Sequence, residues 1–302
     1  MKKIIYYLII LFIIVLAFIY KDEIIKYITN NMVKQEKQEE LKYNNYSKKT
    51  NYEYIKITDD FNIKSNDEIK NVFYTILDSG ISSFSFYCDS SYSKCTDDVT
   101  SFFDDREKLS DINNFVHPYN SFKNIKISIT NYGKITIYIN HVYDKEKIDI
   151  IETKINDFIK QNINNDMSDN DKIKLFHDYI VNNTKFDINI ENSENRLESD
   201  SYTAYGLLVN NLAICGGYTD AMSIYLDKLN IKNYRISTLE HVWNLVYTDN
   251  NWLHLDVTWD DPVTSDNSDM LMYDYYLINS NDLLAKDITQ HNFNKDIYQE
   301  AK

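Results

Sequence analysis

Glycine and proline are scarce in this chain, with five and two copies among 302 residues. Collagen-like repeats and Pro/Gly-rich disordered proteins need far more of both, so the composition excludes these classes. The hydrophobic share of 43% is sufficient for a packed core. The length accommodates one large domain or two small ones.

Clusters of basic residues are also missing. The chain carries 32 Lys and Arg against 46 Asp and Glu, which gives a formal net charge of −14. Proteins that bind nucleic acid usually present a basic face, and an acidic surface disfavours polyanions and anionic membranes. We therefore expect no nucleic-acid partner and interpret the acidic charge as a source of solubility.

One long apolar run follows two lysines at the N-terminus, over residues 4–20. Seventeen helical residues span about 25 Å, the short end of a membrane crossing. Ala17 is the only small residue before Lys21, so a small-x-small cleavage site is missing. We expect residues 1–20 to be an uncleaved single-pass anchor at a bacterial cell surface, with the remaining chain extracellular. Secretion after signal cleavage is the alternative.

Only three cysteines occur. Cys88 and Cys95 are close enough in sequence to close a loop by a disulfide in an oxidising compartment. Cys215 would then be the odd, free thiol. The alternative is that Cys88 and Cys95 are reduced residues of a strand and a loop.

The pattern divides the rest of the chain into three parts. Residues 21–51 are polar and charged and predict a stalk. Residues 52–165 predict a small α/β module without a reactive constellation, and residues 166–302 a second domain. The expected module elements are a helix behind Ser65-x-x-Glu68 that ends near Gly80, a strand at 84–88, a hairpin over 125–139 that turns at 131–134, and a helix around 148–158. A further helix is expected from Ser168 to about Asn183.

Cys215 precedes a buried amphipathic helix, whose apolar residues recur at helical spacing. A helix N-terminus offers free N–H groups and the positive end of the dipole, which stabilise a thiolate. Gly216 and Gly217 would leave room for a substrate near the sulfur and suit a tight start of the helix. Alone, these features fit a buried structural cysteine better. The apolar positions are Tyr218, Ala221, Met222, Tyr225, Leu226 and Leu229.

His241 and Asp256 change this interpretation. Three strands are expected, at 234–239, 241–247 and 252–259, and a turn within 248–251 pairs the last two. A two-residue loop at 248–249 places His241 opposite Asp256, and one at 249–250 places them diagonally on the same face. A three-residue loop would separate them.

A thiol, an imidazole and a carboxylate are the parts of an activated nucleophile. His241 would take the proton of Cys215, and Asp256 would hold the imidazole. The Cys215 N–H is the natural donor to an oxyanion. Candidates for further oxyanion or substrate contacts are Tyr202, Tyr205, Gly216 and Trp243.

Five short runs within about residues 168–262 resemble the motifs of the transglutaminase-like superfamily, in its bacterial papain-like branch. They are Phe176-His177-Asp178-Tyr179-Ile180-Val181, Ser201-Tyr202-Thr203-Ala204-Tyr205-Gly206, Cys215-Gly216-Gly217-Tyr218, His241-Val242-Trp243-Asn244 and Trp252-x-His254-x-Asp256-x-Thr258-Trp259-Asp260-Asp261-Pro262. The resemblance implies an α+β, papain-like fold, with the cysteine on a helix packed against an antiparallel sheet that carries histidine and aspartate. It also implies a Cys215–His241–Asp256 triad. Residues 1–165 lie outside it.

Members of this superfamily include crosslinking enzymes, peptidases, amidases and inactive forms. We therefore expect a cysteine-dependent acyl-transfer enzyme that acts on protein or peptide amides by hydrolysis or transamidation, with proteins of the cell envelope among its candidate substrates. The alternative is a catalytically silent binding or scaffold ectodomain. No cofactor or metal is expected. Zinc at Cys215, His241, His254 and Asp256 lacks paired ligand spacing, and calcium at Asp260, Asp261, Asp266 and Asp269 lacks EF-hand spacing.

Overall fold

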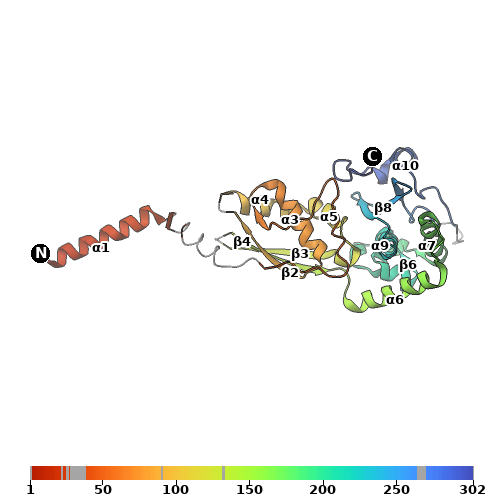
Figure 1. The fold of residues 1–302 in the computed structure, drawn as a ribbon, viewed down its shortest axis with the longest axis horizontal. Helices are drawn as coiled ribbons and strands as arrows, with labels where there is room; N and C mark the ends of the chain where they lie inside the picture. The colour runs from red at the N-terminus through yellow and green to blue at the C-terminus, as the bar shows by residue number, and fades with distance from the viewer. Residues whose placement is uncertain are drawn as a thin grey trace.

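The structure is a computed structural model, which describes residues 2–21, 23–24, 27, 39–89, 91–130, 133–263 and 270–301. These residues form a mixed α+β fold with sheets of four, two and three strands. Figure 1 shows helices α3, α4 and α5 over the four-stranded sheet, and helix α9 beside the strands that carry the candidate site.

The N-terminal apolar run forms helix α1, Lys2–Ile19. No helix among the described residues is both long and apolar enough to cross a membrane. The membrane anchor predicted at residues 1–20 is therefore not supported. Residues 22, 25–26 and 28–38 of the predicted stalk lie outside the described residues.

The four-stranded sheet has the order β1-β2-β4-β3. Its strands are β1 (Asn62–Ile63), β2 (Ser83–Cys88), β3 (Phe122–Ile129) and β4 (Lys134–His141). The predicted hairpin is confirmed, because Ile125, Ile127 and Ile129 pair with Ile139, Ile137 and Ile135. Part of its turn, residues 131–132, lies outside the described residues.

Three helices cover this sheet: α3 (Asn66–Ser79), α4 (Cys95–Asp104) and α5 (Arg106–Asn113). The left-handed Gly80, with φ 69°, ends α3 as predicted. Cys88 and Cys95 form a disulfide between β2 and the first residue of α4, and Cys215 is the free cysteine. The predicted pairing is thus confirmed.

The second half of the chain is built around helix α9, Cys215–Lys228, which packs on strands β7 and β8. The predicted helix behind Ser168 is confirmed as α7, whose N-terminus has a complete capping box with Asp171. The strands are β5 (Lys185–Phe186), β6 (Leu212–Ala213), β7 (Asn233–Ser237), β8 (Val242–Thr248) and β9 (Asn251–Leu255). The α-helices are α6 (Lys145–Asn162), α7 (Asp169–Asn183), α8 (Ile188–Glu191), α10 (Ser280–Lys286) and α11 (Ile288–His291). Shorter turns are η1 (Pro118–Asn120), η2 (Arg196–Glu198), η3 (Asp200–Tyr202) and η4 (Gly206–Asn210).

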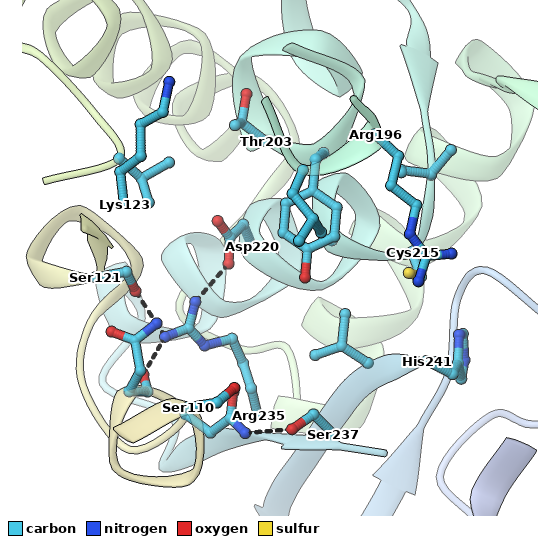
Figure 2. Close-up of a pocket in the computed structure, with 18 of the residues that line it drawn as sticks. Ser110, Ser121, Lys123, Arg196, Thr203, Cys215, Asp220, Arg235, Ser237 and His241 are labelled. Carbon is cyan, nitrogen blue, oxygen red and sulfur yellow. Dashed lines mark hydrogen bonds and ion pairs between the residues drawn. The ribbon is translucent and has the colours of Figure 1, made fainter. Parts of the chain in front are cut away.

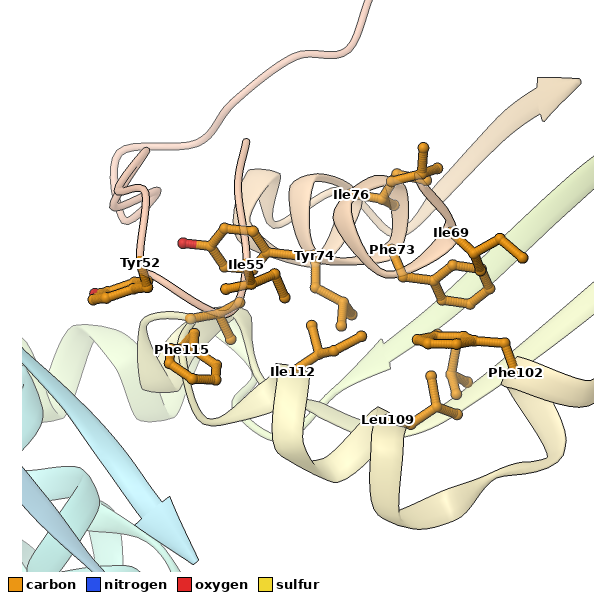
Figure 3. Packing of buried hydrophobic residues seen from close by; sticks show 14 of the residues in the cluster. Tyr52, Ile55, Ile69, Phe73, Tyr74, Ile76, Phe102, Leu109, Ile112 and Phe115 are labelled. Atoms are coloured by element: carbon orange, nitrogen blue, oxygen red, sulfur yellow. The ribbon is translucent and has the colours of Figure 1, made fainter. Parts of the chain in front are cut away.

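One hydrophobic core joins the four-stranded module to the sheet β7-β8-β9. Tyr234 of β7 packs on Tyr52 and Phe115, with ring centroids 5.1 and 4.9 Å apart. Figure 3 shows Tyr52 and Phe115 at one end of the cluster that also buries Phe73 and Ile112. The domain division predicted at residue 165 stays a prediction, but this core holds the two regions in one fixed arrangement.

Candidate active site

Cys215 is the first residue of α9, and its side chain is buried at 8% exposure. The extended Ile214 precedes it, and the Ile214 N–H donates to the Ser201 carbonyl at 2.8 Å. Two other N–H groups of the first turn, those of Gly217 and Tyr218, donate to the Ile214 carbonyl oxygen. Within the described residues the Cys215 N–H has no acceptor, so it points its dipole at the surroundings of the sulfur.

The two glycines after Cys215 allow a close backbone approach at the start of α9, in agreement with the predicted tight start of the helix. A Cβ atom on Gly216 would lie 2.7 Å from the Tyr202 carbonyl oxygen and 2.8 Å from its ring. On Gly217 it would lie 2.7 Å from the Ser201 carbonyl oxygen. Turn η3 therefore packs directly against the start of the helix, where a side chain in place of either glycine would clash. Gly216 also lines the first cavity beside Cys215, and room for a substrate at this point stays a prediction.

The β8–β9 hairpin brings His241 and Asp256 together. Thr248 pairs with Asn251, so the loop is Asp249-Asn250, and both loop residues have positive φ. This is the diagonal of the two favourable registers. His241 and Asp256 lie just beyond the paired strands, and His241 Nε2 lies 2.5 Å from Asp256 Oδ2.

Asp256 is 1% exposed and its carboxylate is fully used. Oδ1 accepts from the N–H groups of Thr258 and Trp259, at 3.1 and 3.3 Å. Oδ2 accepts from His241 and also from His291 Nε2, at 2.9 Å. Burial favours the neutral acid, yet the charges and hydrogen bonds of His241 and His291 hold the pKa of Asp256 well below its usual range.

His241 lies between Asp256 and Cys215. Its ring is stacked on Trp243, with centroids 5.6 Å apart and planes at 17°. Burial disfavours the charged ring, but the Asp256 carboxylate and then the neighbouring Cys215 raise the pKa of His241 to about 10. Because Nε2 is held by Asp256, Nδ1 is left for the sulfur. Figure 2 shows Cys215 and His241 on the wall of one pocket.

Two cavities of about 400 Å³ each meet at this pair. Both are lined by Glu191, Arg196, Cys215, Glu240 and His241. The first cavity continues between β7, turn η3 and the module, where it is lined by Arg106, Ser110, Asn113, Ser121 and Lys123. The second continues along Thr258, Trp259, Pro262, Val263 and Gln290. A thiol at the junction of two cavities is accessible from two sides.

Arg235 fixes the module against the wall of the first cavity. Its guanidinium donates to Asp220 of α9 at 2.8 Å and to Ser121 of the module at 2.7 Å. It also donates to the carbonyls of Asn113 and Val116. At 6% exposure, Arg235 ties the nucleophile's helix to the module, so the module forms part of the cleft.

The structure places the predicted oxyanion candidates Tyr202, Trp243 and Tyr205 in different surroundings. Tyr202 lines the first cavity, and burial followed by the charge of Cys215 raises the pKa of its hydroxyl. Trp243 is 0% exposed, and its Nε1 donates to His254 Nδ1 at 2.9 Å, so it cannot serve an oxyanion. Tyr205 packs in the core behind α9 with Lys147 5.3 Å from its ring centroid, and it lines neither cavity.

The structure does not assemble the zinc set that includes His254. This side chain is buried, and Nε2 lies 2.9 Å from Ser280 Oγ. Burial and the charge of His291 lower the pKa of His254 to about 3. Among the described residues, the group with ligand atoms within 4.8 Å of one another is His241, Asp256 and His291. These atoms already hydrogen-bond to each other.

The calcium set is not assembled either. Asp260 is 3.2 Å from His177 Nε2 and Asp261 accepts from the Tyr218 hydroxyl, so both carboxylates fix the chain after β9. Asp266 and Asp269 lie outside the described residues.

His291 is the residue that sequence reasoning missed. It ends the short helix α11 and reaches Asp256 from the chain's return after α10. The spacing Asp287-x-x-x-His291 was the only local signal, and it is common on helix surfaces.

No family model matches this sequence, and no curated protein matches it. Among solved structures, a transglutaminase aligns with 46% of this chain and 44% of its own length, at 16% identity and a TM-score of 0.33. A protein described as a "putative cysteine protease" from Cytophaga hutchinsonii aligns with 45% of this chain and 61% of its own, at 12% identity and a TM-score of 0.27. The chain thus spans less than two thirds of either neighbour. At these TM-scores the two likenesses carry no argument about its activity.

Proposed function

We propose that this protein is a cysteine-dependent acyl-transfer enzyme of the transglutaminase-like class, acting on amide bonds of proteins or peptides. The observation that supports it most is that His241, which lies 2.5 Å from the buried Asp256 carboxylate, lines the same two cavities as Cys215. The motif order and the start of α9 at Cys215 add to this support.

The proposed reaction begins with a thiolate–imidazolium pair, in which His241 holds the proton of Cys215. The thiolate attacks the amide carbonyl carbon, and the resulting oxyanion accepts from the Cys215 N–H and the Tyr202 hydroxyl. The C–N bond then breaks, and the leaving amine takes the proton from His241 Nδ1. Water or a second amine attacks the thioester and gives a proton to His241. The C–S bond then breaks, and the departing thiolate restores the starting thiolate–imidazolium pair.

Two cavities that meet at the sulfur fit two groups, one on each side of the acyl carbon. One cavity would hold the acyl part and the other the leaving or incoming amine. Hydrolysis and transamidation differ only in whether water or an amine resolves the thioester. We propose hydrolysis of peptide or amide bonds first and crosslinking of envelope proteins second.

Export to an oxidising compartment is part of the proposal. The Cys88–Cys95 disulfide supports it, because such bonds persist outside the cytosol. Titration of thiols in the denatured, unreduced protein recovered from cells tests this directly. One reactive thiol per chain is expected, and three would count against export.

The test of activity is incubation of the purified protein with a dye-linked primary amine and, separately, with peptide libraries. Mass spectrometry would detect cleaved peptides or incorporated amine. Wild-type protein should act on one of the two, and Cys215→Ala should act on neither. Equal products from wild type and Cys215→Ala would overturn the proposal. No product from either, with Cys215 also unreactive toward an alkylating agent, would instead favour the binding or scaffold ectodomain.

A further inference from the structure

We propose that His291 is a positioning residue that stays an imidazolium between two carboxylates, so that its fixed positive charge keeps Asp256 ionised and opposes the charge of His241. The proposal deepens the function proposed above and rests on it.

Both ring nitrogens of His291 contact a carboxylate oxygen. Nε2 lies 2.9 Å from Asp256 Oδ2 and Nδ1 lies 2.9 Å from Asp287 Oδ2. The ring is 0% exposed. The Asp256 oxygen that it meets is the same atom that holds His241 at 2.5 Å. The second histidine therefore acts on the triad through a shared acceptor, and it lines neither of the two cavities at the thiol.

Hydrogen-bond accounting gives the charge. An ionised carboxylate has no proton to donate, so each ring nitrogen of His291 must carry one for both contacts to be hydrogen bonds. The result is a series of alternating charges: Asp287 negative, His291 positive, Asp256 negative and His241 positive. If His291 were neutral, the lone pair of its unprotonated ring nitrogen would face a lone pair of one carboxylate oxygen in a buried site, which is unfavourable.

Asp287 is built to stay ionised. It caps α11 by accepting from the N–H groups of Thr289 and Gln290, at 3.1 and 3.0 Å. Burial favours the neutral acid, but these bonds and that of His291 lower the pKa of Asp287 to about 2. A carboxylate anchored to a helix start fixes the ring's plane as well as its charge.

The other groups around His291 are mostly uncharged. Tyr275 stacks on its ring with centroids 5.4 Å apart, and the rings of Trp243 and Trp259 meet it edge-on. Among titratable groups, His241, Asp256, Asp287 and Tyr275 face it, and His254 is near enough for its charge to be felt. With burial lowering the pKa of His254 to about 3, that ring is neutral at ordinary pH and does not duplicate the role of His291.

The expected consequence is a shift of the whole pH profile. Removing the positive charge makes Asp256 easier to protonate and makes His241 hold its proton to higher pH. Both the acid limb and the alkaline limb of the pH–rate profile should therefore move to higher pH. A residue that served only as packing would lower the rate without moving both limbs in the same direction.

The experiment measures the rate of Cys215 alkylation against pH, because this needs no substrate and remains informative if turnover is never found. His291→Gln should move both limbs up by about one pH unit. Asp287→Asn, which leaves the ring in place but removes its counter-charge, should give a smaller shift in the same direction. The control is His254→Gln, which removes a buried but neutral ring and should leave both limbs unchanged.

Nitrogen-15 NMR of the wild-type protein decides the question if His291→Gln fails to fold. Two protonated ring nitrogens for His291 at neutral pH support the proposal. One unprotonated nitrogen would overturn it, as would unshifted limbs in a folded His291→Gln. An inactive enzyme with the expected shifts would sink the proposed function and leave this inference standing.

Discussion

His241 and Asp256 lie on diagonal positions of one hairpin, yet their side chains meet at 2.5 Å. The two-residue loop Asp249-Asn250 fixes this relationship, because shifting the register by one residue would turn one side chain to the opposite face. The imidazole is thus oriented by local chain geometry, and only the thiol must be supplied by another element.

Asp256→Asn should nearly abolish activity while leaving the fold intact. The amide oxygen can still accept from Thr258 and Trp259, but it no longer stabilises a charged His241. We expect kcat to fall by about 10³–10⁴ and the alkaline limb to move to lower pH, since the pKa of His241 would lose its main positive contribution. Steady-state kinetics on the best substrate measures both, and a loss below tenfold would contradict the assigned role.

The same pair should make stability depend on pH at both extremes. The pKa of His241 is raised in the folded state, so its contribution is complete below the ordinary histidine pKa and is lost as pH rises through about 10. The pKa of Asp256 is depressed, so its contribution is present above the ordinary aspartate pKa and is lost as pH falls through the folded value.

Urea unfolding across this range, in wild type and in His241→Gln, isolates the pair because the other titrating groups are common to both proteins. Near pH 7, removing one partner of a buried ion pair should cost about 3–5 kcal/mol. The difference between the two proteins should narrow toward pH 11. A constant difference would show that His241 carries no charge in the folded protein.

Tyr202→Phe tests the second oxyanion donor. The ring would keep its contact with Gly216, and only the hydroxyl would be removed. Loss of one donor should lower kcat by about 10²–10³ with little change in KM, because the contact forms only in the transition state. Tyr205→Phe is the matched control, since Tyr205 lines neither cavity, and it should leave kcat unchanged. Equal effects of both substitutions would exclude the role of Tyr202.

Gly217→Ala should destabilise the start of α9. The added methyl would meet the carbonyl oxygens of Ser201 and Thr203, at 2.7 and 3.0 Å, and backbone cannot move aside as a flexible side chain can. We expect a loss of about 1–3 kcal/mol in chemical unfolding, together with altered alkylation of Cys215. Unfolding within about 0.5 kcal/mol of wild type would mean that η3 is free to shift.

The site was readable from sequence to the extent that it is local. The order of Cys215, His241 and Asp256, together with the hairpin that pairs the last two, follows from alternation and turn residues within one short segment. Periodicity also located α3, α7 and the β3–β4 hairpin. The choice between the two favourable registers needed the structure, because both loops satisfy the same turn chemistry.

The features that the sequence did not predict depend on contacts between residues that lie far apart in the sequence. His291 reaches Asp256 only because the chain returns to β9 through α10, which contacts both β9 and α11, and no spacing rule predicts such a return. The residues that pack against Gly216 and Gly217, Tyr202 and Ser201, also could not be predicted, because turn η3 brings them there. The N-terminal module was predicted to lack reactive groups, and its share in the cleft became visible only through Arg235.

That bridge has a consequence for how specificity can vary. The guanidinium joins Asp220, on the helix that begins at the nucleophile, to Ser121, in a region with no chemical part in the reaction. One wall of the first cavity is therefore made by module residues that can mutate without disturbing Cys215, His241 or Asp256. Substitutions in this wall would change substrate preference and leave the reaction itself the same. A fragment that begins at residue 166 would lack this wall of the cavity.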